Sequence, residues 1–430
     1  MLVFMLLAAA TAFGDSAMWN LNPTDGDWRT AANWTPATVP NGPNDTATFG
    51  VSNITGVSLE LCELDIEVNG IVFDAGASAF TLTVENNCSF VEDLTISGVG
   101  VTNNSGITQN FAIEHITGEA GKSILFKNSA TAGNLTVFTC NETNIQFLDT
   151  ATAGNATLIA EDGFPSGGLI FFSGDSTGDT ARVEVFGTGV LFISGHNAPG
   201  TTVGSIEGDG LVALGSNNLT VGSNNLSTTF AGVIQDSGSL TKIGTGKLVL
   251  TNANTYTGGT EVEEGGLGVN NMRGSGTGSG AVQVNAGTLA GRGTIAGAVT
   301  VGTGSGAGAV LAPGGSGGKP GNPLTIQSTL TFKSDATYKV DLNSLHVIAD
   351  EVIVNGVTIE NGALFSLLGS GQGILAPGTV FTVIDNTSGT PIAGTFANLA
   401  DGSTLTVKRN TYQANYEGGD GNDLTLTVVP

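Results

Sequence analysis

Apolar residues in this chain occur in short runs of strand length, separated by glycine, asparagine and aspartate. In Leu135–Phe138, Val183–Phe186 and Leu248–Leu250, apolar residues alternate or cluster over three or four positions. Short apolar runs bounded by turn-forming residues are typical of β-strands. We therefore expect a fold of short strands joined by tight corners, where glycine and asparagine adopt left-handed backbone conformations at the least cost.

An internal repeat supports this expectation. Four phenylalanines recur at spacings of 21, 25 and 20 residues: Phe126, Phe147, Phe172 and Phe192. A threonine follows five residues after each of the first three, at Thr131, Thr152 and Thr177. Units this short cannot bury an apolar face alone, so they must stack on one another. The period predicts a β-solenoid in which the phenylalanines form an inward-facing ladder, with a loop inserted around residues 161–168.

Composition narrows the class of protein further. The chain has 430 residues, of which 66 are glycine, and 37 acidic residues against 13 basic ones give a formal charge of −24. This balance excludes a nucleic-acid-binding protein that works through a basic surface. The glycine content argues against a helical bundle, and 40% hydrophobic residues argue against intrinsic disorder. The prediction is an all-β protein that folds.

The N-terminus and the cysteines indicate the compartment. Residues 2–12 form an apolar run that ends in a small-x-small pattern, so we predict a signal peptide over residues 1–17 and secretion. No later segment is apolar for long enough to cross a membrane as a helix. The three cysteines, Cys62, Cys88 and Cys140, are too few for a disulfide framework. We expect buried free thiols, although Cys62 and Cys88 could pair if they lie on neighbouring turns.

The chain divides into regions that differ in their sequence pattern. We predict an N-terminal cap over residues 18–60, a β-solenoid over 61–312, a Gly/Pro-rich loop over 313–323, and C-terminal solenoid coils with a cap over 324–430. The solenoid region includes further repeat-like segments at 204–269 and 282–311. Three tryptophans, Trp19, Trp28 and Trp34, lie in the predicted cap, where they could cover the first open rung.

One segment resembles a known family. Residues Ser239–Thr260 closely resemble the autotransporter-associated β-strand repeat of bacterial surface proteins, through the Gly244-x-Gly246 corner, the Leu248-x-Leu250 strand and the Asn254–Gly258 turn. The segment around Asn33-Trp34 and Asp45–Phe49 resembles the start of secreted proteins of this type. The resemblance implies a right-handed parallel β-helix, passenger-like and displayed outside the cell.

The resemblance also shapes the expected export route. A self-exporting autotransporter carries a C-terminal membrane barrel, whereas about 170 residues follow the repeat here and they match the end of a passenger. We therefore expect no barrel-dependent export from this chain alone. The ending Val428-Val429-Pro430 is compatible with the start of a Pro-Glu-Pro sorting signal, a hypothesis that the downstream gene would test.

The sequence indicates functional sites less clearly than it indicates the fold. We predict no catalytic, cofactor-binding or metal-binding residue. Gly418–Asp423 resembles a calcium-binding nonapeptide. Only one copy of this motif occurs, so we interpret it as a glycine corner before the last strand. Gly314-x-Ser316-x-Gly318 satisfies a hydrolase pattern without the strand-to-helix context, so we interpret it as a loop.

Histidines and paired acids offer no clear constellation either. His115, His196 and His346 show no metal-ligand spacing. Adjacent acids occur at Glu92-Asp93, Glu161-Asp162, Glu263-Glu264 and Asp350-Glu351, and solvated corners explain each of them.

These observations predict a secreted or cell-surface β-helix protein with a structural or adhesive role and without catalysis. Partners would be surface polysaccharide or other matrix and cell-surface components, not nucleic acid. The alternative is a polysaccharide-active β-helix enzyme, a lyase or hydrolase, with an unrecognised site. A third hypothesis is a calcium-stabilised module.

Overall fold

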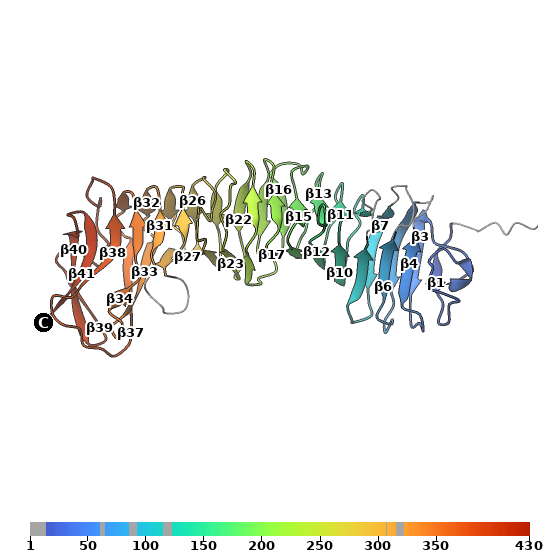
Figure 1. Cartoon of the computed structure of the whole chain (residues 1–430), viewed down its shortest axis with the longest axis horizontal. Helices are drawn as coiled ribbons and strands as arrows, with labels where there is room; N and C mark the ends of the chain where they lie inside the picture. The colour runs from blue at the N-terminus through green and yellow to red at the C-terminus, as the bar shows by residue number, and fades with distance from the viewer. Residues whose placement is uncertain (1–13, 61–64, 86–92, 115–122, 307, 315–321) are drawn as a thin grey trace, which may run out of the picture. The chain divides into compact units, whose positions relative to one another are not determined.

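The structure, a computed structural model, describes residues 14–60, 65–85, 93–114, 123–306, 308–314 and 322–430. The described residues form strands joined by turns, with one short 3₁₀ helix, η1 (Ala31–Asn33), and no α-helix (Figure 1). The chain forms two compact units, Met1–Asn197 and Ala198–Pro430.

Two sheets of mainly parallel strands build the first unit. The first sheet contains β2 (Trp34–Thr35), β1 (Ala17–Trp19), β3 (Gly42–Phe49), β5 (Ile66–Phe73), β7 (Leu94–Asn103), β9 (Ser123–Phe126), β11 (Asn144–Phe147), β13 (Leu169–Phe172) and β15 (Val190–Phe192). The second contains β4 (Gly56–Glu60), β6 (Thr81–Glu85), β8 (Gln109–Ile113), β10 (Asn134–Cys140), β12 (Asn155–Ala160) and β14 (Arg182–Val185). From β3 to β15, consecutive strands of the chain alternate between the sheets, which is the topology of a parallel β-solenoid.

The repeat spacing is the spacing between rungs. Phe126 pairs with Phe147, and Phe147 pairs with Phe172, in the parallel ladders β9–β11 and β11–β13. All three side chains are fully buried, and their rings stack with centroids 4.8 and 4.9 Å apart. Thr131, Thr152 and Thr177 are joined by successive parallel bridges. The inward phenylalanine ladder is confirmed for these three rungs, and the longer spacing falls in the 161–168 segment between β12 and β13.

Phe192 does not belong to that ladder, which corrects the prediction. Phe192 pairs with Phe171, and Leu191 is the residue that pairs with the buried Ile170. Phe171 and Phe192 are half-buried on the outer face, where their rings stack 5.3 Å apart. Successive side chains of a strand point to opposite faces, so a spacing of 20 instead of 21 moved the phenylalanine to the other side.

The N-terminal tryptophans form one buried cluster. Trp19, Trp28 and Trp34 are each at most 1% exposed, and all three rings pack around Phe49 at the end of β3. Their indole N–H groups donate to the backbone oxygens of Ile54, Pro40 and Trp28, respectively. Phe49 in turn stacks on Phe73 of the next rung, 5.4 Å away. The cluster therefore extends the aromatic core toward the N-terminus.

In the second unit, the solenoid has three ladders of parallel strands and a C-terminal extension. One contains β16 (Gly200–Val203), β19 (Asn218–Val221), β22 (Ser239–Lys242), β24 (Thr260–Val262), β26 (Val282–Val284), β29 (Val299–Val301), β32 (Leu330–Phe332) and β36 (Val357–Ile359). Another contains β17 (Ser205–Gly208), β20 (Thr228–Phe230), β23 (Lys247–Leu250), β25 (Gly266–Val269), β27 (Gly287–Gly291), β30 (Ala309–Pro313), β33 (Ala336–Asn343), β37 (Leu364–Ser370) and the short β34 (Ile348–Ala349). The third side begins with β18 (Leu211–Ala213) paired to β21 (Val233–Gln235) and resumes at β28 (Thr294–Ile295), β31 (Leu324–Ile326) and β35 (Val352–Val354).

A column of leucines packs in the core of this unit. Leu248, Leu267, Leu289 and Leu311 pair in register across β23, β25, β27 and β30, and each is at most 1% exposed. The column continues to Tyr338 on β33, which is fully buried. Each rung thus buries one large apolar side chain in the same position, which is the stacking that short units require.

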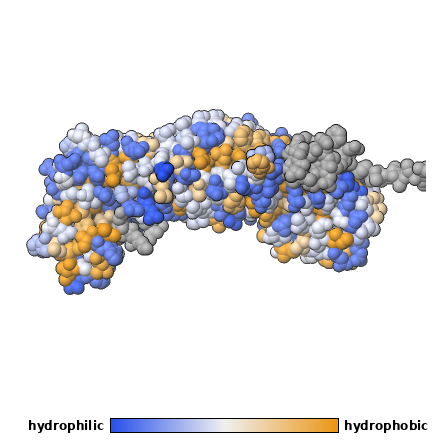
Figure 2. Space-filling view, viewed as in Figure 1, coloured by the Kyte–Doolittle hydropathy of each residue, from blue (hydrophilic) through white to orange (hydrophobic). Residues whose placement is uncertain are grey.

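The C-terminal strands depart from parallel coils. β38 (Val380–Asn386) pairs with β35 in parallel, but β41 (Asp423–Val429), β40 (Asn410–Gly418) and β39 (Thr404–Val407) follow in antiparallel pairing. Large apolar side chains stay exposed near this end, among them Leu345, Leu364 and Ile374. Figure 2 shows apolar surface gathered there on the visible face. The antiparallel hairpins were not predicted from the sequence.

Several sequence predictions lie outside the described residues. They are the apolar run of the predicted signal peptide, Cys62, Cys88, Glu92, His115 and Ser316. Cys140 is described and is a buried free cysteine, as expected. In the described part of the chain, no helix is long and apolar enough to span a membrane.

Candidate functional site

The calcium-like segment is a hairpin turn. Gly418–Asp423 joins β40 to β41, and Gly418 pairs with Asp423 across the turn. The Asp423 carboxylate accepts a hydrogen bond from the backbone N–H of Asn386, at 2.9 Å. The glycines therefore serve a reversal of the chain between antiparallel strands, and not a corner between stacked coils.

The two described histidines lie apart. Both ring nitrogens of His196 lie 2.6 Å from backbone oxygens, those of Ser176 and Asn197, so the ring joins neighbouring corners. His346 is exposed in the turn after β33. Among the described residues, no three histidine, cysteine, aspartate or glutamate side chains are grouped closely enough to hold a metal ion.

One of the acidic pairs contradicts the prediction of a solvated corner. Asp350 of the Asp350-Glu351 pair is only 4% exposed, whereas Asp162 lies at an exposed loop and accepts two hydrogen bonds from Thr188. Burial raises the pKa of Asp350 to about 7, and it also raises the pKa of Glu351. A carboxyl group with such a pKa is typical of functional sites, so its surroundings define the candidate site.

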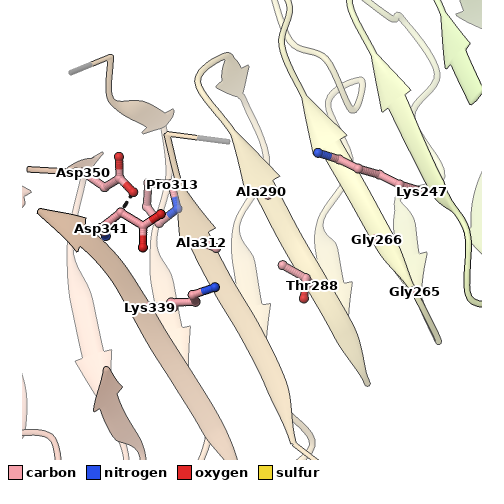
Figure 3. A pocket seen from close by; sticks show the side chains of 10 residues that line it. All are labelled: Lys247, Gly265, Gly266, Thr288, Ala290, Ala312, Pro313, Lys339, Asp341 and Asp350. Atoms are coloured by element: carbon pink, nitrogen blue, oxygen red, sulfur yellow. Dashed lines mark hydrogen bonds between the residues drawn. The ribbon is translucent and has the colours of Figure 1, made fainter. Parts of the chain in front are cut away.

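Asp350 lies beside a cavity of about 290 Å³ on the outer face of the second unit (Figure 3). The cavity is lined by Lys247, Gly265, Gly266, Thr288, Ala290, Ala312, Pro313, Lys339, Asp341 and Asp350. These residues come from five neighbouring strands, β23, β25, β27, β30 and β33, and from the segment after β34. Parallel pairing therefore brings together residues that are about 100 positions apart in the sequence.

Small side chains form the floor of this cavity. Gly266 pairs with Thr288, and Ala290 pairs with Ala312, so glycine, alanine and threonine cover three adjacent strands. Gly268 has a direct role, because a Cβ atom there would lie 2.9 Å from Cε of Lys247. The absence of a side chain lets the lysine stem lie flat across β25. A glycine inside a strand often marks this kind of close approach.

Two lysines flank the floor. Lys247 on β23 and Lys339 on β33 point toward each other across it (Figure 3). Four strand-to-strand steps of about 4.8 Å separate their backbones, a total of about 19 Å. In the described part of the chain, no ion pair or hydrogen bond holds the Lys339 ammonium group. The two lysines lie in the same cavity as two aspartates, Asp341 and Asp350.

Backbone hydrogen bonds with Asp341 of β33 hold Asp350 in place, and the missing side chain of Gly314 leaves room for its carboxyl group. Its Oδ2 accepts a hydrogen bond from the Asp341 N–H at 3.1 Å, and its own N–H donates to the Asp341 oxygen at 2.8 Å. Gly314 has a φ of +81°, and a Cβ atom there would overlap Oδ1 of Asp350. Burial is the main cause of the raised pKa of Asp350; the neighbouring Asp341 carboxylate raises it further, whereas the Asp341 N–H and Lys339 lower it.

Asp341 offers an unsatisfied acceptor. Its Oδ1 is buried and has no hydrogen-bond partner among the described residues. Buried polar atoms nearly always have a partner, because a buried acceptor without one costs about 1–3 kcal/mol. The cavity thus combines ammonium donors, a carboxylate acceptor and a carboxyl group that is half-protonated near neutral pH. Two lysines and two aspartates leave the cavity without a strong net charge of either sign.

Sequence reasoning missed this site for an identifiable reason. Its charged residues are far apart in the chain, and only the register of five strands brings them together. Two signals could have indicated it: glycines inside a strand at Gly266 and Gly268, and charged residues on the outward positions of the apolar strand Tyr338–Leu342.

The fold and the cavity define a parallel β-solenoid with a small charged site on its outer face. Residues 240–269 match the passenger-associated-transport-repeat family, so the chain carries one copy of this autotransporter passenger repeat. The match covers β22 to β25 and no more of the chain. No curated protein matches the chain.

Among solved structures, the Hap adhesin of Haemophilus influenzae is similar to this chain, with 11% sequence identity and a TM-score of 0.35. The alignment covers 97% of this chain and 48% of the adhesin, so the chain spans about half of the adhesin's length. The fold is established by the strand pairing described above, and not by this similarity.

Proposed function

We propose that this protein is a secreted or surface-displayed bacterial β-solenoid with a structural or adhesive role and without catalysis. The proposal rests on the structural role of the matched repeat, which joins successive coils. Asn254 is buried and accepts a hydrogen bond from the N–H of Ile234 at 2.7 Å, while its side-chain amide donates to the oxygen of Gly276 at 2.6 Å. One side chain of the repeat thus joins three successive coils.

The other hallmark residue of the repeat is also structural. Tyr256 is fully buried, and its hydroxyl lies 2.6 Å from Oγ1 of Thr260. Neither Asn254 nor Tyr256 lines the cavity. The repeat therefore supports a stackable scaffold, which suits a passenger that presents its outer surface. The formal charge of −24 supports solubility outside the cell.

Surface display is tested on intact cells of the source bacterium. An antibody against the chain should label cells that have not been permeabilised, or detect the protein in the medium, while a cytoplasmic marker stays protected. Deleting the gene should reduce attachment of the cells to a surface or to each other, and expression from a plasmid should restore it. Detection only in the cytoplasmic fraction would overturn the proposal.

A second function is favoured by one observation, the pKa of Asp350. A carboxyl group with a pKa of about 7, next to a lysine in a cavity, has the properties of an acid–base catalyst in polysaccharide cleavage. Incubation with pectin and alginate distinguishes the two functions. New reducing ends or an unsaturated product, lost in Asp350→Asn, would establish the enzyme, and their absence would support the scaffold.

A further inference from the structure

The parallel ladder from β16 to β36 carries a second hollow on its outer face, separate from the cavity beside Asp350. We name it the glycine hollow; its volume is about 380 Å³. The strands that carry its walls, β19, β22, β24 and β26, are neighbours in the ladder. None of the described residues that line it is basic, and those that matter here are Asn218, Ser239, Thr241, Gly259, Glu261 and Gln283.

Strand register explains why the surface is hollow at this point. Thr241, Glu261 and Gln283 pair in register on β22, β24 and β26 and form one outward column. Ser239 begins the adjacent column, in which the next position is Gly259. Gly259 has a φ of +96°, a conformation that favours glycine. Because this position has no side chain, the column is interrupted, and the hollow lies open beside Glu261.

Hydrogen bonds inside the glycine hollow leave its hydroxyl groups as acceptors. Oγ of Ser239 and Oγ1 of Thr241 both donate to Oδ1 of Asn218, at 2.8 and 3.0 Å. A hydroxyl group has one hydrogen, so each oxygen can then only accept. Nε2 of Gln283 donates to the oxygen of Gly302 at 2.9 Å, which leaves Oε1 as an acceptor. Ser239, Thr241 and Gln283 are half-buried and line the hollow, so a ligand can reach them.

Glu261 adds a negative charge to these neutral acceptors. Its side chain is exposed, and its carboxylate forms no ion pair or hydrogen bond with a described residue. Thr241 and Gln283 lie on either side of it in the column, each one strand step of about 4.8 Å away. The substituents of one sugar ring span such a distance. A ligand that matches the hollow therefore carries a positive charge flanked by hydrogen-bond donors.

We propose that the glycine hollow binds a hexosamine unit of a cationic amino-sugar polysaccharide, with the ammonium group facing Glu261 and hydroxyl groups donating to Thr241 and Gln283. A lysine side chain supplies the ammonium group but no hydroxyl donor for the neutral oxygens. A peptide backbone brings a carbonyl acceptor with every N–H donor, whereas a sugar hydroxyl rotates to donate. An uncharged sugar leaves Glu261 without an ionic partner.

The inference gives the adhesive role proposed above a class of ligand, and it rests on that role only for its biological meaning. Binding is measured on purified protein and surface display on cells, so the two proposals fail separately.

The test is isothermal titration of the purified full chain with the glucosamine trisaccharide, at about pH 6, where its amino groups are protonated. Salt at about 0.15 M screens the general negative charge of the chain. The N-acetylated trisaccharide is the matched comparison ligand, because it has the same skeleton without the charge, and trilysine carries the charge without the sugar. We expect binding of the glucosamine trisaccharide and at least tenfold weaker binding of the other two.

Variants of the chain locate the binding. Glu261→Gln removes the charge and keeps the shape, so it should reduce the affinity for the glucosamine trisaccharide at least tenfold. Thr241→Val should reduce it several-fold. Glu263→Gln is the matched control, because Glu263 is an exposed glutamate just after β24 that does not line the hollow, and it should change the affinity less than twofold.

Unfolding temperatures of all variants show whether each one is folded. Absence of binding to the glucosamine trisaccharide by the folded native protein would overturn the proposal. Equal binding of the N-acetylated trisaccharide would overturn it as well, and equal or tighter binding of trilysine would indicate a lysine-rich protein instead. An undiminished affinity in folded Glu261→Gln, or an equal loss in Glu263→Gln, would show that the glycine hollow is not the site.

Discussion

The two units use the same inward pattern and opposite outward patterns. Inward, a large apolar residue stacks on every rung: phenylalanine at Phe126, Phe147 and Phe172 in the first unit, and leucine from Leu248 to Leu311 in the second. Outward, the first unit carries the bulky pair Phe171 and Phe192, whereas the second carries the glycine and alanine floor of the cavity. The inward column determines the fold, and the outward one determines what the surface can bind.

Stacking explains why both inward columns work. Ring centroids at 4.8 and 4.9 Å match the spacing of about 4.8 Å between paired strands, so identical rings can stack on every rung without distortion. The leucines stack in the same manner, but in a different ladder from that of the phenylalanines, along β23, β25, β27 and β30. The small outward residues of the second unit then leave room for the Lys247 stem, which the Phe171 and Phe192 rings would not.

The largest expected effect concerns the aromatic end of the first unit. Deleting residues 18–50 removes the tryptophan cluster and β3, and so exposes Phe73, Phe80 and the parallel edge of β5. Exposed edges of parallel sheets associate, so the truncated protein should form oligomers. Light scattering measures this, and the exposed Met18→Ala serves as the control that stays monomeric. A strictly monomeric truncation would show that the cluster is not a cap.

The next effect tests the inward and outward assignment of neighbouring phenylalanines. Phe147→Ala should lower the free energy of unfolding by about 3–5 kcal/mol, because it leaves a cavity between two stacked rings. Phe171→Ala removes a half-buried ring and should cost about 1 kcal/mol or less. Urea denaturation gives both values. Equal losses of unfolding free energy in the two variants would contradict the assignment of Phe147 to the inner face and Phe171 to the outer face.

The second unit offers the matching pair. Leu289→Ala should cost about 2–5 kcal/mol, because Leu289 is fully buried in the leucine column. Its neighbour Thr288 faces the cavity, so Thr288→Ala should change stability by about 0.5 kcal/mol or less. A large loss from Thr288→Ala, measured by thermal unfolding, would argue that the outer face is structural as well.

The smallest effect is the dependence of stability on pH that Asp350 causes. Its pKa is about 7 in the folded protein and 3.8 in an unfolded chain, so between these values the folded state holds a proton that the unfolded state releases. The stabilisation is present below about pH 4 and is lost as the pH rises through 7. Asp350→Asn should therefore unfold at the same temperature as the native protein near pH 4, and be more stable by about 1–3 kcal/mol at pH 8. A variant that is less stable at pH 8 would contradict the raised pKa.

The sequence allowed much of the fold to be predicted, because the repeat is local. The spacings of Phe126, Phe147 and Phe172 are the rung lengths, and the threonines that follow them align as expected. Phe192 was assigned to the wrong face because the dipeptide Phe171-Phe172 offers two possible phases and spacing alone does not choose between them. A shift of one residue hardly changes the sequence pattern, but it moves the side chain to the opposite face of the sheet.

The candidate site could not be predicted in the same way. Asp341 and Asp350 meet because β34 folds back against β33, and Lys247 joins them only through the pairing of five strands. Neither contact leaves a local motif. The acidic pair at Asp350 looked like a solvated corner because two adjacent charges usually avoid burial, and it is the hydrogen bond from the Asp341 N–H that holds the buried carboxyl group in place.

The register of the rungs is the central claim, and cross-linking tests it most directly. Gln146 and Phe171 are outward neighbours in the β11–β13 ladder, within the distance that a disulfide spans, whereas Ser173 lies two positions further along. With Cys62 and Cys88 replaced by serine, Cys140 should not compete, since burial raises the pKa of its thiol to about 12. Mild oxidation followed by mass spectrometry should show a disulfide in Gln146→Cys/Phe171→Cys and none in Gln146→Cys/Ser173→Cys. The reverse result, or no disulfide in either variant, would contradict the solenoid register.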